Sequence, residues 1–196
     1  ALVLAERLGG EIVSIDSRLI YRGMDIGTAK PTSAERARVP HHLIDLADPD
    51  ETWSLPRFQD EVYRIVPEIV GRGRPPLLVG GTGQYMRAVL EGWSPPARAH
   101  DPRLRARLEA EAQGGGGAEL AARLRHVDPE SAARIDPRNL RRVIRALEIY
   151  EATGRPASAH VGRRMPPFAA RVIGVSRPRA ELYARIDRRI DDMIRE

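Results

Sequence analysis

The spacing of hydrophobic and polar residues changes along the first part of the chain from a helical to a strand pattern. Residues 1–8 place apolar side chains as an amphipathic helix does, and the two glycines that follow are a typical helix stop signal. The β-branched run 11–16 predicts a buried strand with Asp16 at its carboxyl end. Residues 42–46 predict a second short strand, so the chain begins with a helix that leads into a sheet.

The same succession repeats further along the chain. From Ser54 onward, apolar residues recur every three or four positions, which predicts an amphipathic helix that ends near Gly71. The apolar run 76–80, bounded by proline and glycine, predicts a central strand, and a further helix is expected over residues 84–91. Strands that alternate with helices through short glycine-rich joins are typical of a parallel α/β sheet, whose ligands gather at the carboxyl ends of the strands.

The middle of the chain has a different pattern, rich in arginine, alanine and glutamate and without a convincing strand. A β-branched run over residues 170–175 and a helical pattern after it then predict that the sheet resumes. We therefore expect an α/β core over residues 1–94, an all-helical insert over residues 95–167, and a return to the core over residues 168–196. The helical patterns at both ends lack caps, which predicts that the chain is a piece of a longer protein.

Composition narrows the class of protein. Of the 196 residues, 42% are hydrophobic and 30% are charged, which argues against a disordered chain. No apolar run approaches the roughly 20 residues that span a bilayer. Because cysteine is absent, disulfides, cysteine-ligated zinc and a thiol nucleophile are excluded. We expect a cytoplasmic protein that is a monomer and has no contact with membranes.

The positive charge of the chain is almost all arginine. There are 32 basic and 27 acidic residues, a net charge of +5, and Lys30 is the only lysine. A GC-rich genome, whose codons favour arginine, would explain this bias. Arginine also suits bidentate contacts with phosphate groups. Keeping one lysine where arginine is otherwise used hints that a compact ammonium is required at that position.

The positions of four arginines favour the second explanation. Arg138, Arg141, Arg142 and Arg145 follow helical spacing, beside a neighbouring apolar stripe on the same expected helix. Like charges at this spacing repel one another unless anions lie nearby, which favours contact with phosphates. A solvated helix face is the alternative.

Two segments carry a resemblance to a known family. Residues 15–31 contain Asp16-Ser17 and end in Gly-Thr-Ala-Lys-Pro, and residues 77–85 read Leu-Leu-Val-Gly-Gly-Thr-Gly-Gln-Tyr. Together with Leu-Glu-Gly at 90–92 and Arg-Ala-Leu-Glu at 145–148, the chain closely resembles the tRNA dimethylallyltransferases, also called tRNA isopentenyltransferases, over nearly its whole length. The resemblance implies a P-loop NTPase-like parallel sheet without its first strand, and a helical insert that contacts the anticodon stem of tRNA.

The same resemblance implies an activity. Family members transfer a dimethylallyl group from dimethylallyl diphosphate to the exocyclic N6 amine of the adenosine just 3′ of the tRNA anticodon. Their phosphate-binding loop precedes the helix at residues 1–8, so we expect no diphosphate-binding residue and no metal ligand in this chain. Mg²⁺ would be a cofactor of the full-length enzyme, and the chain alone is expected to be inactive.

Individual site residues also follow from the resemblance. Asp16 matches the family's catalytic base, and Thr82 matches a residue beside the substrate, so both are candidate catalytic residues. The positions that match tRNA contacts are Asp16, Ser17, Arg18, Leu19, Thr82, Arg105, Arg141, Arg142, Val143, Ile144 and Arg145.

Other interpretations of these residues remain open from the sequence. Asp16 could cap a turn or hold Mg²⁺ through water, and Thr82 could be a helix N-cap. The pair His41-His42 could suggest a metal site, but adjacent residues of a strand point to opposite faces. For the whole protein, the alternatives are a P-loop nucleoside or nucleotide kinase with an arginine-rich lid, an adenylate isopentenyltransferase, and a non-catalytic RNA-binding module.

Overall fold

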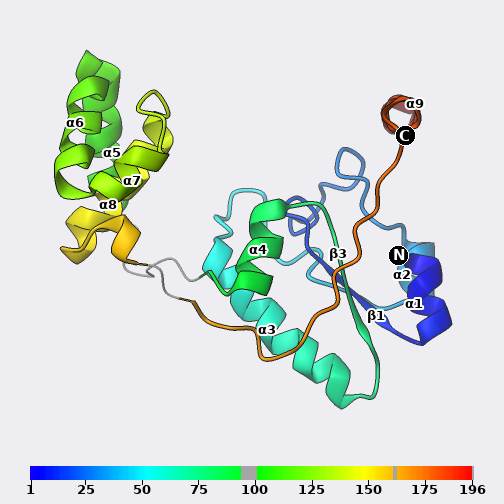
Figure 1. Cartoon of the computed structure of the whole chain (residues 1–196). Helices are drawn as coiled ribbons and strands as arrows, with labels where there is room; N and C mark the ends of the chain where they lie inside the picture. Colours follow the sequence, from blue (N-terminus) through cyan, green and yellow to red (C-terminus); the bar gives the residue numbers. More distant parts are fainter. Residues whose placement is uncertain (94–100, 161–162, 196) are drawn as a thin grey trace. The chain divides into compact units, whose positions relative to one another are not determined.

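The computed structural model describes residues 1–93, 101–160 and 163–195, which group into two compact units (Figure 1). The first, the sheet unit, comprises Ala1–Glu91 and Met165–Glu196. The second, the helical unit, comprises Gly92–Arg164. Among the described residues, no helix has both the length and the apolar character needed to cross a bilayer.

The sheet unit contains a small parallel sheet, as the alternating pattern predicts. Its strands are β1 (Glu11–Ser14), β2 (His41–His42) and β3 (Pro76–Val79), in the spatial order β2-β1-β3. In the register of the sheet, Ile12 lies opposite both His41 and Leu77. The mixed α/β fold with a parallel sheet is thus confirmed, and β1, the central strand, is buried along its whole length.

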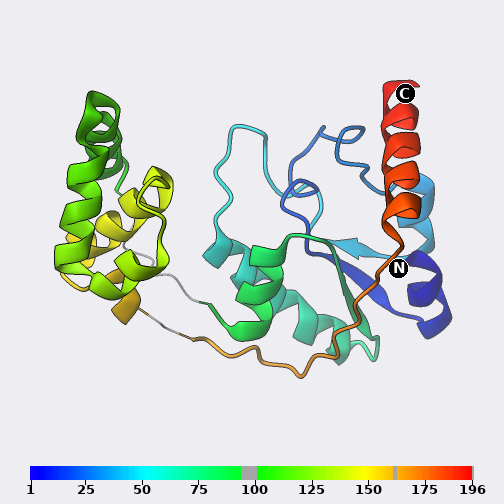
Figure 2. The same cartoon turned by 45° about the horizontal axis from the view of Figure 1, so that its top comes forward.

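Helices connect the strands and cover the sheet (Figure 2). The predicted helices form with small shifts in their bounds, and the first ends at Gly9. One helix was not predicted, and it begins where the Thr32 hydroxyl and the Glu35 carboxylate cap each other's backbone. The helices are α1 (Leu2–Leu8), α2 (Ser33–Arg38), α3 (Leu55–Gly71) and α4 (Gly83–Glu91).

The core of the sheet unit lies between α3, α4 and the central strand. The Ser54 hydroxyl caps the start of α3, whose apolar stripe then packs against the sheet. Phe58 of α3 stacks on Tyr85 of α4 with ring centroids 4.1 Å apart. The helical spacing read from the sequence is thus the spacing that buries this stripe.

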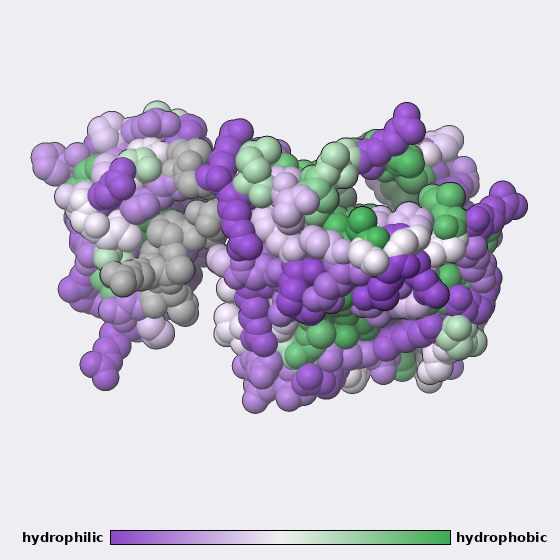
Figure 3. Space-filling view, turned by 90° about the horizontal axis from the view of Figure 1, so that it is seen from below, coloured by the Kyte–Doolittle hydropathy of each residue, from purple (hydrophilic) through white to green (hydrophobic). Residues whose placement is uncertain are grey.

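The expected strand over residues 170–175 does not form, and this part of the prediction is wrong. The segment is drawn as a loop (Figure 2), and Val172, Ile173 and Val175 are 65%, 73% and 87% exposed. A β-branched run becomes a strand only when a neighbouring strand offers hydrogen bonds, and no described strand pairs with this one. Helix α9 (Arg179–Arg195) follows, also with exposed apolar residues, and hydrophobic surface is visible on the sheet unit in Figure 3.

The helical unit packs its helices around a second core. Gly115 has a φ of +95°, a conformation that residues with a Cβ rarely adopt, and it makes the kink between the first two long helices. The buried core residues are Leu108, Leu120, Leu124, Val143, Ile144, Ala146 and Leu147. The elements are α5 (Pro102–Glu111), η1 (Ala112–Gly116), α6 (Gly117–Val127), α7 (Pro129–Arg134), α8 (Leu140–Thr153) and η2 (Ala157–Ala159).

A buried carboxylate holds the short elements of the helical unit together. Asp128, 1% exposed, accepts hydrogen bonds from the backbone N–H of Ser131 at 3.0 Å and of Ser158 at 2.9 Å. The Ser158 hydroxyl donates a third bond at 2.7 Å. Burial by itself raises the pKa of a carboxyl, but the hydrogen bonds from Ser131 and Ser158 outweigh it and lower the pKa of Asp128 from 3.8 to about 2.

This lowered pKa predicts an acid-sensitive contribution to stability. Because the folded pKa lies below the unfolded value, ionised Asp128 stabilises the fold by about 2 kcal/mol above pH 4, and this is lost between about pH 4 and pH 2. Urea unfolding across that range, followed by circular dichroism, measures it. Asp128→Asn is expected to remove this part of the pH dependence, and Glu130→Gln, at an exposed position of α7, is expected to keep it. Equal pH profiles for Asp128→Asn and wild type would contradict the assignment.

Candidate active site and nucleic-acid interface

The ends of two neighbouring parallel strands bring Asp16 and Thr82 into one region of the sheet unit. Strand β1 leads directly into Asp16-Ser17, and β3 leads into Gly80-Gly81-Thr82. The backbone N–H of Ser17 donates to the Thr82 hydroxyl at 3.1 Å, and that hydroxyl donates to Oγ of Ser17 at 3.4 Å. Parallel strands end at the same edge of a sheet, which is why residues 65 positions apart in sequence meet here.

Gly80 is required by the close approach of these two strand ends. A Cβ added there would lie 2.2 Å from the carbonyl oxygen of Ile15, whereas one at Gly81 would meet nothing within 4 Å. Small residues before Thr82 could in principle make room for a substrate to approach the backbone. At Gly80 this interpretation is replaced by a contact between two backbones.

The Asp16 side chain is partly engaged by its own loop. Its Oδ1 accepts a hydrogen bond from the Arg18 backbone N–H at 2.8 Å, which is the turn-capping role that the sequence left open. Oδ2 accepts no hydrogen bond from the described residues, and no cation among them pairs with this carboxylate. The half-buried carboxylate therefore keeps one oxygen that can accept a proton.

The loop after Asp16 is held by backbone pairing. Arg18 is exposed and Leu19 is half-buried. The Leu19 carbonyl accepts from the N–H of Asp45 at 3.1 Å, and the Ile20 carbonyl accepts from the N–H of Leu46 at 2.7 Å. The stretch that carries Ser17, Arg18 and Leu19 is thus fixed at both ends rather than left as a free loop.

In the helical unit, the predicted row of four arginines is only partly present. Arg138 precedes α8, whose N-cap is Asn139, and its guanidinium pairs with Asp136 at 2.9 Å. The prediction that Arg138 belongs to the helix face is therefore wrong, because the helix begins two residues later. Arg141 and Arg142 are exposed and form no ion pair with any residue that the structure describes.

A buried glutamate joins two more arginines to this region. Glu148 of α8 is 0% exposed, and its Oε2 accepts from Arg105 of α5 at 3.3 Å and from Arg145 at 3.2 Å. These contacts bring Arg105 beside Arg145, although 40 positions separate them in sequence. We call Arg105, Arg141, Arg142 and Arg145 the arginine cluster.

Two of the residues predicted to contact RNA are buried in the helical unit. The side chains of Val143 and Ile144 are 1% and 4% exposed and pack in the core of the helical unit. They therefore present no side-chain surface to a nucleic acid in this structure, and the expectation is corrected for their side chains. Their positions between the exposed Arg142 and the half-buried Arg145 follow from helical spacing, which turns every third or fourth residue inward.

Comparison with known proteins identifies the family. A family model described as IPP transferase matches residues 19–196, nearly the whole chain. The chain belongs to the IPP transferase family. The tRNA dimethylallyltransferase of Roseiflexus sp. strain RS-1 is 56% identical over 97% of this chain, and that of Chloroflexus aurantiacus strain J-10-fl is 57% identical over 99% of it.

Solved structures of IPP transferase relatives share the fold. The tRNA isopentenylpyrophosphate transferase of Bacillus halodurans matches with a TM-score of 0.62 and 45% identity over 99% of this chain and 60% of its own. A eukaryotic dimethylallyltransferase acting on tRNA matches with a TM-score of 0.78 and 27% identity over 99% of this chain and 48% of its own. The chain covers 63% and 66% of the Roseiflexus and Chloroflexus relatives, so it spans less than two thirds of their length.

The candidate metal ligands of this IPP transferase family member are dispersed among the described residues. In the parts of the chain that the structure describes, no three histidine, aspartate or glutamate side chains are grouped as a metal site. His42 instead contacts the buried Glu11, at 2.5 Å from Nε2 to Oε2. Mg²⁺ is usually held by one or two carboxylates together with waters and substrate phosphates, so a protein cluster of three ligands is not what it requires.

Sequence reasoning missed a charged cluster in this family member. Lys30 is buried, and its ammonium contacts both Asp25 and Asp45 at 2.6 Å. Burial by itself lowers the pKa of Lys30, but the hydrogen bonds to the two carboxylates outweigh it, so the pKa is raised and the ammonium stays charged. Its status as the only lysine was the available signal, but the acceptors could not be found from spacing.

Proposed function

We propose that the full-length protein containing this chain is a tRNA dimethylallyltransferase. The reaction would form a bond between the exocyclic N6 amine of the adenosine 3′ of the anticodon and C1 of dimethylallyl diphosphate. The C1–O bond breaks, diphosphate leaves with the electron pair, and the amine loses one proton. The observation that carries the proposal is the meeting of two strand ends, where Ser17, next to Asp16, bonds to Thr82, in a chain whose relatives bear that enzyme name over nearly its whole length.

Asp16 is the group that we assign to the amine. The lone pair of an adenine amine is delocalised into the ring, so a carboxylate that orients the amine and accepts its proton would assist the attack. The free Oδ2 of Asp16 suits this role, while Oδ1 is held by the Arg18 backbone. The adenosine would have to leave its stack to reach this carboxylate, as bases do in other enzymes that modify them.

Ser17 and Thr82 would shape the site around Asp16. Their mutual hydrogen bonds fix the two strand ends, and the open space at Gly81 leaves the backbone beside Thr82 accessible. Arg18 and Leu19 would then contact the nucleotides near the target base. Diphosphate binding, and Mg²⁺ with it, would depend on residues outside this chain, so we expect residues 1–196 alone to be inactive.

The helical unit is proposed to hold the anticodon stem-loop. Exposed Arg141 and Arg142 would contact phosphates directly, since no described carboxylate neutralises them. Arg105 and Arg145 would approach RNA from positions set by Glu148. This assigns the sheet unit to chemistry and the helical unit to RNA binding.

A transfer assay tests the proposed function. The full-length protein is incubated with an anticodon stem-loop RNA and dimethylallyl diphosphate, and the modified adenosine is detected by mass spectrometry. Prenylated adenosine at the position 3′ of the anticodon is the expected product. Phosphate transfer from ATP without RNA would favour the kinase alternative, and prenylation of free adenine nucleotide alone would favour the adenylate isopentenyltransferase. RNA binding without any transfer would favour the binding module.

The arginine cluster predicts a salt-dependent RNA affinity. Arg142→Ala is expected to weaken binding of the stem-loop and to reduce the slope of log affinity against log salt by about 1, as expected for one lost phosphate contact. Fluorescence anisotropy at several salt concentrations measures both. Arg134→Ala removes the same charge from the same unit, where Glu130 already pairs with it, and should leave the slope unchanged. An unchanged slope in Arg142→Ala would remove Arg142 from the interface.

A further inference from the structure

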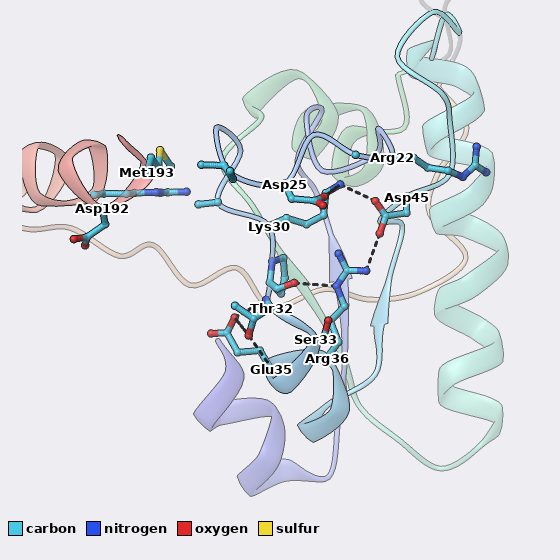
Figure 4. Close-up of a pocket in the computed structure, with 15 residues that line it drawn as sticks. Arg22, Asp25, Lys30, Thr32, Ser33, Glu35, Arg36, Asp45, Asp192 and Met193 are labelled. Carbon is cyan, nitrogen blue, oxygen red and sulfur yellow. Dashed lines mark hydrogen bonds and ion pairs between the residues drawn. The ribbon is translucent and has the colours of Figure 1, made fainter. Parts of the chain in front are cut away.

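Lys30 occupies a site in which all of its hydrogen-bond donors are used. Its side chain is 1% exposed, and Nζ lies 2.7 Å from the carbonyl oxygen of Tyr21 and 2.6 Å from a carboxylate oxygen of both Asp25 and Asp45. An ammonium has three N–H donors and here meets three acceptors, of which Asp25 and Asp45 are labelled in Figure 4. Lys30 therefore has no donor left for a ligand.

The three acceptors come from separate stretches of the sheet unit. Tyr21 lies in the segment after Asp16, Asp25 lies in the next turn, and Asp45 follows β2. Asp45 has a φ of +58°, which non-glycine residues rarely adopt, and its second oxygen accepts from Arg36 at 2.7 Å. The two cations thus hold Asp45 in an otherwise unfavourable conformation, and the four charged groups balance one another.

Lys30 is connected to the candidate active site through the backbone. Residues 19–22 pair with residues 45–47, and Lys30 bonds to both of these stretches, at Tyr21 and at Asp45. On the other side, Ser17 is tied to Thr82. The short segment that begins at Asp16 is therefore held at one end by the hydrogen bond between Ser17 and Thr82. At the other end it is held by the backbone pairing of residues 19–22 with 45–47, which Lys30 bridges.

We propose that Lys30 is a positioning residue, whose buried ammonium ties Tyr21, Asp25 and Asp45 together and so holds the segment 16–22 in its reactive place. The proposal rests on the proposed function, in which Asp16 acts on the adenosine amine. A small displacement of a reacting group, of about 1 Å, can lower a rate by about 100-fold. Arginine does not replace lysine here, because a planar guanidinium directs its donors differently from an ammonium.

The first test compares three variants of the full-length protein. Lys30→Met keeps the length of the side chain without its charge, and Asp45→Asn leaves the ammonium in place but removes the charge from its partner. Both are expected to lower kcat by about 10- to 100-fold, while KM for dimethylallyl diphosphate changes less than about 2-fold. Arg38→Met breaks a surface ion pair with Glu6, at 2.7 Å, away from this segment, and is expected to leave kcat unchanged.

Two further results separate positioning from a direct role. The double variant Lys30→Met/Asp45→Asn is expected to be no slower than the slower single variant, because both changes break one connection. If Lys30 acted on the diphosphate itself, Lys30→Met would raise KM for dimethylallyl diphosphate and Asp45→Asn would keep the wild-type rate, which would overturn the proposal. If Lys30→Met does not fold, Asp25→Asn replaces it in the test, because it changes an exposed carboxylate partner of Lys30. Asp25→Asn is expected to lower kcat about 3-fold. An unchanged kcat in both Asp25→Asn and Asp45→Asn would also overturn the proposal.

Hydrogen exchange provides a readout independent of activity. The amides of Arg22, Leu46 and Ala47 donate to the paired backbone, at 2.9 Å, 2.7 Å and 3.1 Å. In Lys30→Met they are expected to exchange at least 10-fold faster, and unchanged exchange would overturn the proposal. A wild-type protein that transfers no prenyl group would overturn the proposed function alone, and the exchange rates would still decide whether Lys30 holds this segment.

Discussion

Asp16→Asn in the full-length protein is expected to lower the rate of dimethylallyl transfer by about 10²- to 10⁴-fold, the range that general acid–base catalysis supplies. Asparagine keeps the shape of the side chain, and its amide oxygen can still accept from the Arg18 N–H, so the turn should persist. It cannot accept the proton of the adenosine amine. Single-turnover prenylation of the stem-loop measures the rate, and anisotropy measures RNA affinity, which should change less than about 2-fold.

A matched aspartate distinguishes this effect from a general loss of charge. Asp50→Asn changes an exposed carboxylate of the same unit, in the loop between β2 and α3, and should transfer at the wild-type rate. A wild-type rate in Asp16→Asn would remove Asp16 from the chemistry. A loss of rate with an equal loss of RNA affinity would instead make Asp16 a binding residue.

Gly80→Ala is expected to destabilise the protein by about 3 kcal/mol, toward the upper end of the usual cost of overpacking. The added Cβ would lie 2.2 Å from the carbonyl oxygen and 2.4 Å from the carbonyl carbon of Ile15. Both of these are backbone atoms of the neighbouring chain segment, so no side-chain rotation relieves the contact. The strand ends must separate, which also breaks the hydrogen bonds between Ser17 and Thr82.

Gly81→Ala is the paired control for this prediction, because its Cβ would meet nothing within 4 Å and its φ is not in the left-handed region. Urea unfolding followed by circular dichroism should place Gly81→Ala within about 0.5 kcal/mol of wild type. Equal stabilities for the two alanine variants would show that the strand ends do not approach as closely as the structure has them.

Local patterns predicted those parts of the fold whose stability comes from neighbours close in sequence. Helix α3 and strand β3 follow from periodicity and from the Ser54 cap, and the parallel sheet follows from their alternation. The run 170–175 has the same β-branched composition as β1, but it has no strand partner among the described residues. Composition indicates a preference for the strand conformation, whereas hydrogen bonding to a neighbouring strand depends on residues far away in sequence.

The candidate site was predictable to a similar degree. Asp16 and Thr82 could be placed at strand ends, because a parallel sheet gathers those ends on one edge. The sequence pattern could not show that Arg138 lies outside α8. Asn139 caps the start of that helix, and Asp136 pairs with the Arg138 guanidinium. The partners of Lys30 depend on two separate loops with positive φ angles, one at Ala29 and the other at Leu43 and Asp45, which no periodic pattern encodes.

The glutamate shared by Arg105 and Arg145 has a consequence for the entropy of binding. Two long side chains that are already held by a buried carboxylate have lost part of their rotamer freedom before any anion arrives, so ordering them again costs little. Arg141 and Arg142 keep that freedom and contribute mainly by attracting anions over a distance. Under the proposed binding of RNA, Arg105 and Arg145 would therefore favour slow release of the phosphates, and Arg141 and Arg142 would favour their rapid capture.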